Sequence, residues 1–205
     1  MELRVDTFST FEELYKYWKE AERVQTTFTA IVLSTEIAGL DKKITNFIID
    51  HKNELTDMSG KSCAVFMETP IKNFTKITTL PYKEISYSVA NLLKVTPDKF
   101  PSIVFFDNLI RPKKMVLVTL AEILNSESSD DELASFFRAL FTITQECAAS
   151  KENRLNELEK AIQKKWKTGK QSNVDFTKIA ETTLSITEIG KNISGIALEI
   201  MNRFK

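Results

Sequence analysis

Few residues in this chain have the types and spacing that chemistry needs. The cysteines, Cys63 and Cys147, lie too far apart in sequence to match the spacing of a metal site or a redox pair. His51 is the single histidine, so histidine-rich metal sites are excluded. Its neighbours, Asp50 and Lys52, predict that it lies on a solvated helix face. We expect both thiols to be buried packing residues, and we expect neither a metal nor a cofactor.

The segment Gly60-Lys61-Ser62 is similar to the end of a phosphate-binding loop. That motif needs a glycine five residues before Gly60, where this chain has Leu55, and a helix after the lysine. The apolar residues that follow Ser62 predict a strand instead. The sequence therefore excludes a nucleotide-binding loop at this point.

The composition is that of an ordinary globular protein. Hydrophobic residues make up 42% and charged residues 27% of the 205 residues, and fourteen phenylalanines can fill a core. Lys plus Arg and Asp plus Glu balance at 28 each, so no net charge attracts nucleic acid or anionic membrane. The N-terminus lacks the apolar region of a signal peptide, and no stretch is long enough to span a bilayer. We therefore expect a cytoplasmic protein without a membrane partner.

Hydrophobic periodicity predicts helices and strands in alternation. They are expected at about residues 9–23 (helix), 28–34 (strand), 40–57 (helix), 62–68 (strand) and 83–94 (helix). Ser9-Thr10-Phe11-Glu12 has the pattern of a capping box that opens the first helix. Ser59-Gly60 is expected to end the second helix.

The following segments predict a hairpin and two more helices. Strands are expected at residues 103–106 and 114–120, and their short connection favours an antiparallel pair. The acidic stretch 126–132 favours the start of a helix, because carboxylates stabilise the positive end of the helix dipole. A charged helix is predicted at residues 151–167 and a turn at 168–173.

The most regular pattern is formed by six isoleucines near the end of the chain. They occupy the a and d positions of a heptad repeat: Ile179, Ile186, Ile189, Ile193, Ile196 and Ile200. Thr182 and Arg203 are the polar d positions. The pattern predicts one buried helix stripe. It leaves open whether the stripe packs on its own domain or forms a coiled coil, either between two chains or as a helical hairpin.

A proline-led strand gives the clearest indication of the fold. Phe100-Pro101 precedes the apolar run 103–106, and the order of elements before and after it resembles the thioredoxin-like proteins over residues 1–148. The resemblance implies an α/β fold with a central mixed sheet flanked by helices, and residues 149–205 would be a helical extension. It also implies that Pro101 is cis and that its strand faces the site where relatives carry a Cys-x-x-Cys motif.

That motif is missing here. The corresponding stretch, residues 34–39, reads Ser-Thr-Glu-Ile-Ala-Gly. Dithiol chemistry needs a low-pKa thiolate at a helix N-terminus, whereas Glu36 would place a negative charge there. The hydroxyls of Ser34 and Thr35 have pKa values too high for a resting nucleophile without a base. The resemblance therefore implies a redox-inactive member that is not an enzyme.

We expect a non-catalytic module that binds a protein or peptide partner. The resemblance implies a groove bordered by Thr35, Glu36, Phe100 and Pro101, where an extended peptide can pair in strand fashion. The isoleucine stripe would mediate homodimerisation or docking. A first alternative is a thiol-independent transferase that uses the same groove.

A second alternative is a nucleic-acid-associated subunit that works through the basic stretch 160–170. Glu157 and Glu159 dilute the charge of this stretch. The sequence therefore disfavours nucleic acid as a partner.

Overall fold

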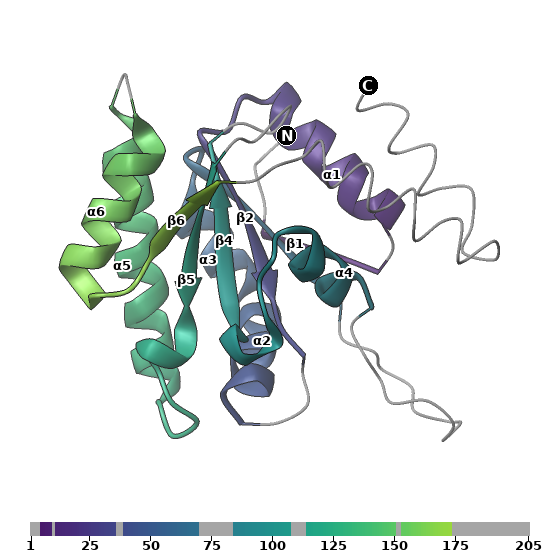
Figure 1. The fold of residues 1–205 in the computed structure, drawn as a ribbon, viewed down its shortest axis with the longest axis vertical. Coiled ribbons are helices and arrows are strands. Elements are labelled where there is room, and N and C mark those ends of the chain that lie inside the picture. Colours follow the sequence, from purple (N-terminus) through teal and green to yellow (C-terminus); the bar gives the residue numbers. More distant parts are fainter. Residues whose placement is uncertain are drawn as a thin grey trace.

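The protein is a mixed α/β structure built on one six-stranded sheet (Figure 1). The computed structural model describes residues 5–9, 11–35, 39–69, 84–107, 114–150 and 153–173. The strands are β1 (Val5–Phe8), β2 (Phe28–Leu33), β3 (Cys63–Glu68), β4 (Ser102–Phe106), β5 (Lys114–Thr119) and β6 (Lys170–Asn173). The helices are α1 (Phe11–Arg23), α2 (Gly39–Asp50), α3 (Lys52–Ser59), α4 (Glu84–Leu92), α5 (Asp130–Ala148) and α6 (Arg154–Trp166), with short 3-10 turns η1 (Pro97–Lys99) and η2 (Leu120–Glu122).

The sheet has a parallel half and an antiparallel half. Its strand order is β1-β3-β2-β4-β5-β6. β3 runs parallel to both β1 and β2, whereas β4, β5 and β6 each run antiparallel to the preceding strand in that order. β2 and β3 are buried along their whole length, as expected for continuous apolar runs covered on both faces. The predicted hairpin of β4 and β5 is confirmed.

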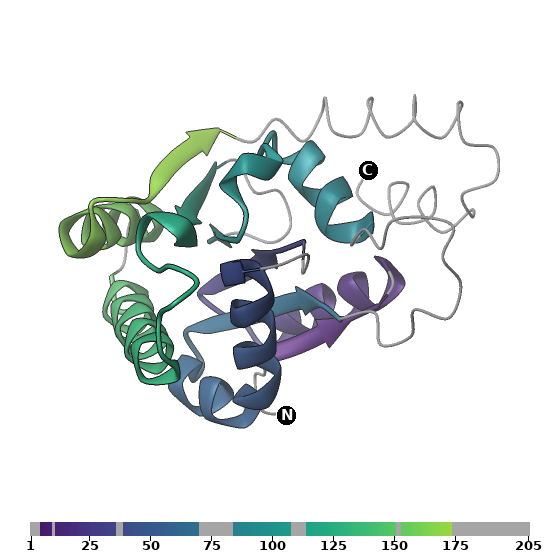
Figure 2. The same ribbon diagram turned by 90° about the horizontal axis from the view of Figure 1, so that it is seen from below.

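Each face of the sheet is covered by its own set of helices (Figure 2). Along β4, Ile103 and Phe105 pack into the core under α2, α3, α5 and α6, while Val104 and Phe106 pack into the core under α1 and α4. This alternation follows from the two-residue period of a strand. The sheet therefore separates two cores. We call them the α5 face and the α4 face.

The helix ends agree in part with the sequence expectations. The acidic stretch opens α5 as predicted: Ser129 is the N-cap, and it exchanges two hydrogen bonds with Glu132 in a capping box. At the start of α1, the N–H and hydroxyl of Ser9 donate to Glu13. The sequence pattern predicted Glu12 as the partner of Ser9, so this prediction was wrong by one residue.

The helix predicted over residues 40–57 is divided in two. α2 ends at Asp50 and α3 begins at Lys52, because His51 leaves the helical conformation with φ −106° and ψ 20°. No glycine or proline lies at this break, and the hydrophobic periodicity continues through it. The sequence therefore predicted one continuous helix. Gly60, with φ 54°, ends α3 as expected.

Two strands were missed by sequence reasoning. β1 is short, and only its ends, Val5 and Phe8, are buried, so it shows no clear alternation. β6 lies where a turn was predicted at residues 168–173. Its residues are polar, and their pairing with β5 rather than their own hydrophobicity forms the strand.

The described part of the expected helical extension packs on the α5 face. Leu155, Leu158 and Ile162 of α6 are buried in the same core as α5, and β6 extends the same sheet. Packing is therefore continuous across the boundary proposed at residue 148. Residues 174–205, with all six isoleucines of the predicted stripe, lie outside the described residues.

Candidate functional site

Three of the four predicted site residues, Thr35, Phe100 and Pro101, lie at one end of the sheet. β2 and β4 are antiparallel, with Leu33 opposite Ser102. Because Thr35 and Pro101 lie just beyond these paired residues, they share the same end of the sheet. The Phe100–Pro101 peptide bond is cis, which confirms the expectation for Pro101. Glu36, the fourth predicted residue, lies outside the described residues.

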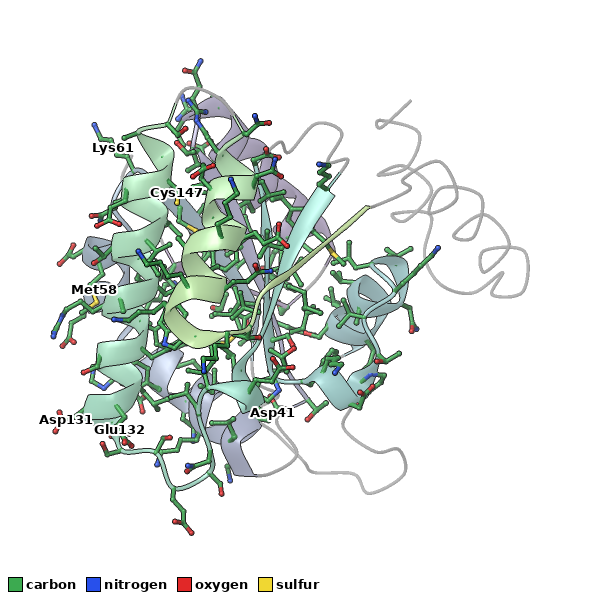
Figure 3. All side chains as sticks on the ribbon, turned by 60° about the vertical axis from the view of Figure 1, so that its left-hand side comes forward. Asp41, Met58, Lys61, Asp131, Glu132 and Cys147 are labelled. Carbon is green, nitrogen blue, oxygen red and sulfur yellow. The ribbon has the colours of Figure 1, made fainter. Side chains whose placement is uncertain are left out.

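Asp41 is a residue of this site that sequence reasoning missed. It lies in the first turn of α2 and is only 7% exposed (Figure 3). Its Oδ2 accepts a hydrogen bond from the backbone N–H of Thr35 at 2.6 Å and a second one from the Thr35 hydroxyl. The carboxylate also stands at the positive end of the α2 dipole, where negative charge is stabilised. In the sequence, its position six residues after Thr35 was the one indication of this contact.

The hydroxyl groups of this end are directed inward. The Ser34 Oγ and the Thr45 Oγ1 are 3.1 Å apart, and both residues are buried. The Thr35 hydroxyl donates to Asp41. A carboxylate, with a pKa near 4, is far too weak a base to ionise an alcohol at rest. The contact between Thr35 and Asp41 therefore acts first as a structural connection between the end of β2 and the start of α2.

The backbone around the cis proline is largely engaged within the chain. The Pro101 carbonyl accepts a hydrogen bond from the Leu120 N–H at 2.9 Å, and the Phe100 N–H donates to the Pro97 carbonyl at 3.1 Å. β4 also has β2 on one side and β5 on the other. Strand-like pairing of a peptide beside Pro101 would therefore have to replace contacts that already exist.

An aromatic pair with a polar border lies beside this turn. Phe100 is half-buried, and its ring lies 5.5 Å from that of Tyr87 on α4, tilted by 47°. Residues 96–99, just before Phe100, are all exposed. We call Tyr87, Phe100 and residues 96–99 the Phe100 surface. Apolar rings bordered by polar groups are typical of protein contact sites.

The cysteines are buried far from this surface, as predicted. Cys63 lies on β3, and burial raises the pKa of its thiol strongly. Cys147 lies late in α5, where burial, followed by the charges of Glu157 and Glu146, raises the pKa of its thiol (Figure 3). Both shifts favour the neutral thiol over the reactive thiolate.

The environment of His51 differs from the solvated face that was expected. Its side chain is 35% exposed, and the ring stacks on Phe47 at 4.4 Å. Its Nδ1 lies 3.3 Å from the Glu54 carboxylate. His51 thus packs at the break between α2 and α3. These contacts are those of a structural side chain at a helix junction.

The basic stretch on α6 is interrupted. Lys160 pairs with Glu157 at 3.1 Å, and Trp166 turns toward α5, where its ring lies 5.0 Å from that of Phe136. Lys164 and Lys165 remain exposed. A basic surface for nucleic acid gains affinity from interleaved aromatic rings, but Trp166 packs against the protein instead.

Three further observations concern metal ions, membranes and known proteins. Within the described ranges, no three His, Cys, Asp or Glu side chains are grouped so that they could hold a metal ion. None of the helices in the described part of the chain is long and apolar enough to cross a membrane. Comparisons with protein-family models, with curated proteins and with solved structures found no match to this chain.

Proposed function

We propose that this chain is a redox-inactive relative of the thioredoxin-like proteins and acts as a non-catalytic protein-binding module. The order of β1 to β5 and the proline before β4 support the relationship. The observation that carries the functional proposal is the partly buried contact between Asp41 and Thr35. It puts a carboxylate in the first turn of α2, the region where the resemblance implies a reactive thiol.

Exchange with a disulfide needs an attacking thiolate. A thiolate can attack sulfur, whereas a carboxylate held by two hydrogen bonds cannot replace it in that reaction. The two thiols of the chain, Cys63 and Cys147, are in the core of the α5 face, and burial raises the pKa of both. Thiol chemistry is therefore disfavoured at the site and elsewhere.

The Phe100 surface is the proposed contact with the partner. Half-buried aromatic rings can bury further apolar area on association without a large loss of side-chain entropy. The proposed partner is a protein segment that presents an apolar side chain to Phe100 and Tyr87, while residues 96–99 form the polar border. In this arrangement the partner does not need the backbone groups of Phe100 and Pro101 that the fold already uses.

A disulfide reductase assay tests the first half of the proposal. We expect the wild-type chain with excess dithiothreitol to reduce insulin no faster than dithiothreitol alone. The double variant Cys63→Ala/Cys147→Ala should give the same rate. A wild-type rate well above this control would contradict the redox-inactive assignment.

A peptide array tests the second half. Wild-type chain, Phe100→Ala and the control Arg138→Ala, at an exposed position of α5 outside the Phe100 surface, are applied to the same array of random peptides. We expect bound peptides to share an apolar anchor, and we expect Phe100→Ala but not Arg138→Ala to lose them. Equal binding by Phe100→Ala would place the contact elsewhere.

The predicted isoleucine stripe adds a proposal for assembly. A heptad seam of this length can hold two chains together as a coiled coil, so we propose a homodimer. Light scattering across a concentration series should give twice the 23.4 kDa mass of one chain. Ile189→Asp/Ile193→Asp should give the single-chain mass, while Thr187→Asp/Ser194→Asp, with the same new charges off the seam, should stay dimeric. A monomeric wild type would contradict the proposed assembly.

A further inference from the structure

The turn before the cis proline has a second property that partner binding does not explain. Residues 96–99 read Thr-Pro-Asp-Lys, and all four are exposed. Thr96 has φ −79° and ψ 148°, which is an extended backbone. Its hydroxyl thus lies on an extended, solvent-facing segment. Pro97 follows it directly, and the basic residue Lys99 lies two residues beyond that proline.

We propose that Thr96 is a phosphorylation site for a protein kinase that selects proline directly after the acceptor residue. Proline has a fixed φ and no N–H, so an apolar kinase pocket can hold it without leaving an unsatisfied donor. Lys99 can pair with an acidic group of the kinase. The recognised unit is therefore the exposed turn itself, with the Thr96 hydroxyl as the nucleophile.

The structure separates this site from a second segment with the same sequence pattern. Residues 69–72 read Thr-Pro-Ile-Lys. Thr69 is half-buried, directly follows β3, and donates its N–H to the Phe8 carbonyl at 2.6 Å. Because β3 lies between β1 and β2, a kinase could bind the chain before Thr69 only by extracting an inner strand.

The segment around Thr96 needs much less rearrangement. After Thr96 the turn is closed by two backbone hydrogen bonds, from the Lys99 N–H to the Thr96 carbonyl at 3.0 Å and from the Phe100 N–H to the Pro97 carbonyl at 3.1 Å, and the Ser102 hydroxyl donates to the Lys99 carbonyl. An exposed 3-10 turn of this length opens locally at low free-energy cost. The two threonines share the same sequence pattern, but we expect the kinase to modify Thr96 and not Thr69.

The transfer uses the nucleoside triphosphate that the kinase binds. A bond forms between the Thr96 Oγ1 and the γ-phosphorus, and the bond from that phosphorus to the β,γ-bridging oxygen breaks. The nucleoside diphosphate leaves with the bonding electron pair, and the hydroxyl proton passes to the kinase's base. No oxidant or reductant is required.

Phosphorylation would change the turn through Asp98. The Thr96 hydroxyl donates a hydrogen bond to Asp98, which lowers the pKa of that carboxyl. A phosphate removes this donor and places about −1.5 to −2 charges beside a carboxylate, so the two repel. The turn would then open and move Phe100. This consequence for partner binding rests on the proposed function, whereas the modification itself does not.

The test treats the folded full-length chain with a purified proline-directed kinase, Mg²⁺ and ATP, and locates phosphate by peptide mass mapping. We expect one phosphate, on Thr96. Thr96→Ala and Pro97→Ala should lose nearly all incorporation, Thr96→Ser should keep it, and Thr69→Ala should match the wild type. Phosphate on Thr69 instead, or a folded wild type that takes none while an unfolded peptide of residues 90–102 is modified, would overturn the proposal.

Hydrogen exchange tests the consequence for the turn separately. We expect the amides of Lys99 and Phe100 to exchange faster in the phosphorylated chain, while amides of α5 stay unchanged. Modification of Thr96 with unchanged exchange would overturn the opening of the turn and leave the site in place. Failure of the peptide array with normal phosphorylation would instead remove the proposed function alone.

Discussion

In the part of the chain that the structure describes, the two faces of the sheet are covered to different depths. Four of the described helices, α2, α3, α5 and α6, pack on the α5 face, whereas α1 and α4 cover the α4 face. On the α5 face, Phe137 contacts three other rings, with centroids 5.7 Å from Phe47, 5.2 Å from Phe136 and 6.1 Å from Phe141. On the α4 face, the stacked pair of Tyr17 and Phe66 is 6.1 Å apart.

The difference in helix cover suggests different roles for the two faces, one in stabilising the fold and the other in the proposed recognition of a partner. The residues that suggest redox chemistry by type, Cys63 and Cys147, belong to the thicker α5 face, where they are packed away. The Phe100 surface belongs to the thinner side, since Phe100 packs against the core of the α4 face. Regions with fewer buried contacts open and adapt more readily. Under the proposed function, the α5 face would hold the fold and the α4 face would meet the partner.

The largest expected effect comes from truncating the aromatic cluster of the α5 face. Phe137→Ala should lower the free energy of unfolding by about 3–5 kcal/mol, because Phe137 is fully buried and its removal leaves a cavity. Tyr17→Ala, on the α4 face, should cost about 0.5–3 kcal/mol, since the ring is only half-buried. Urea unfolding followed by circular dichroism measures both. Equal losses, or a larger loss for Tyr17→Ala, would break the proposed difference between the faces.

A smaller effect should be confined to the α4 face. Glu68 is buried at the end of β3 and accepts hydrogen bonds from the backbone N–H groups of Ile85 and Ser86, at 3.3 Å and 2.7 Å, at the start of α4. Glu68→Ala leaves these donors without that acceptor and should cost about 1–3 kcal/mol. Glu68→Gln keeps an acceptor oxygen and should cost less.

Hydrogen exchange distinguishes a local from a global effect of this substitution. In Glu68→Ala we expect faster exchange at the amides of Ile85 and Ser86, with protection in α5 close to that of the wild type. Equal acceleration in both helices would mean that the two faces unfold as one unit.

The sequence predicted the parts of the fold that local periodicity specifies. Residues close together in the chain specify the apolar runs of β2, β3 and β4. They also specify the amphipathic stripe of α5 and the acidic residues at its start, near Asp130. The missed strands depend on distant partners: Val5 pairs with Val65, and Leu117 with Lys170. A short or polar segment carries little information about such pairing.

The candidate site was predicted only in outline. The sequence assigned Thr35 and Pro101 to one groove, and both residues lie at the same end of the sheet. The cis bond before Pro101 was expected from the resemblance and is present. The contact of Asp41 was not expected, since a carboxylate in the first turn of a helix ordinarily indicates a solvated charge near the dipole. Only the folded structure shows that Asp41 accepts hydrogen bonds from Thr35.

The last prediction uses Cys63 to test whether water is excluded from the core of the α5 face. Burial raises the pKa of the Cys63 thiol in the folded chain, whereas the unfolded value is about 8.5. Its contribution to stability is thus complete below about pH 8.5 and is lost as the pH rises further, by up to about 1.4 kcal/mol per pH unit. Cys63→Ala should be less stable at pH 7.5 but should lose less stability between pH 8.5 and 10. Other titrating groups are common to both proteins, so their effects cancel in the difference. Parallel curves would mean that the thiol ionises in the folded chain, which requires water to reach the centre of the face that we infer to be closed.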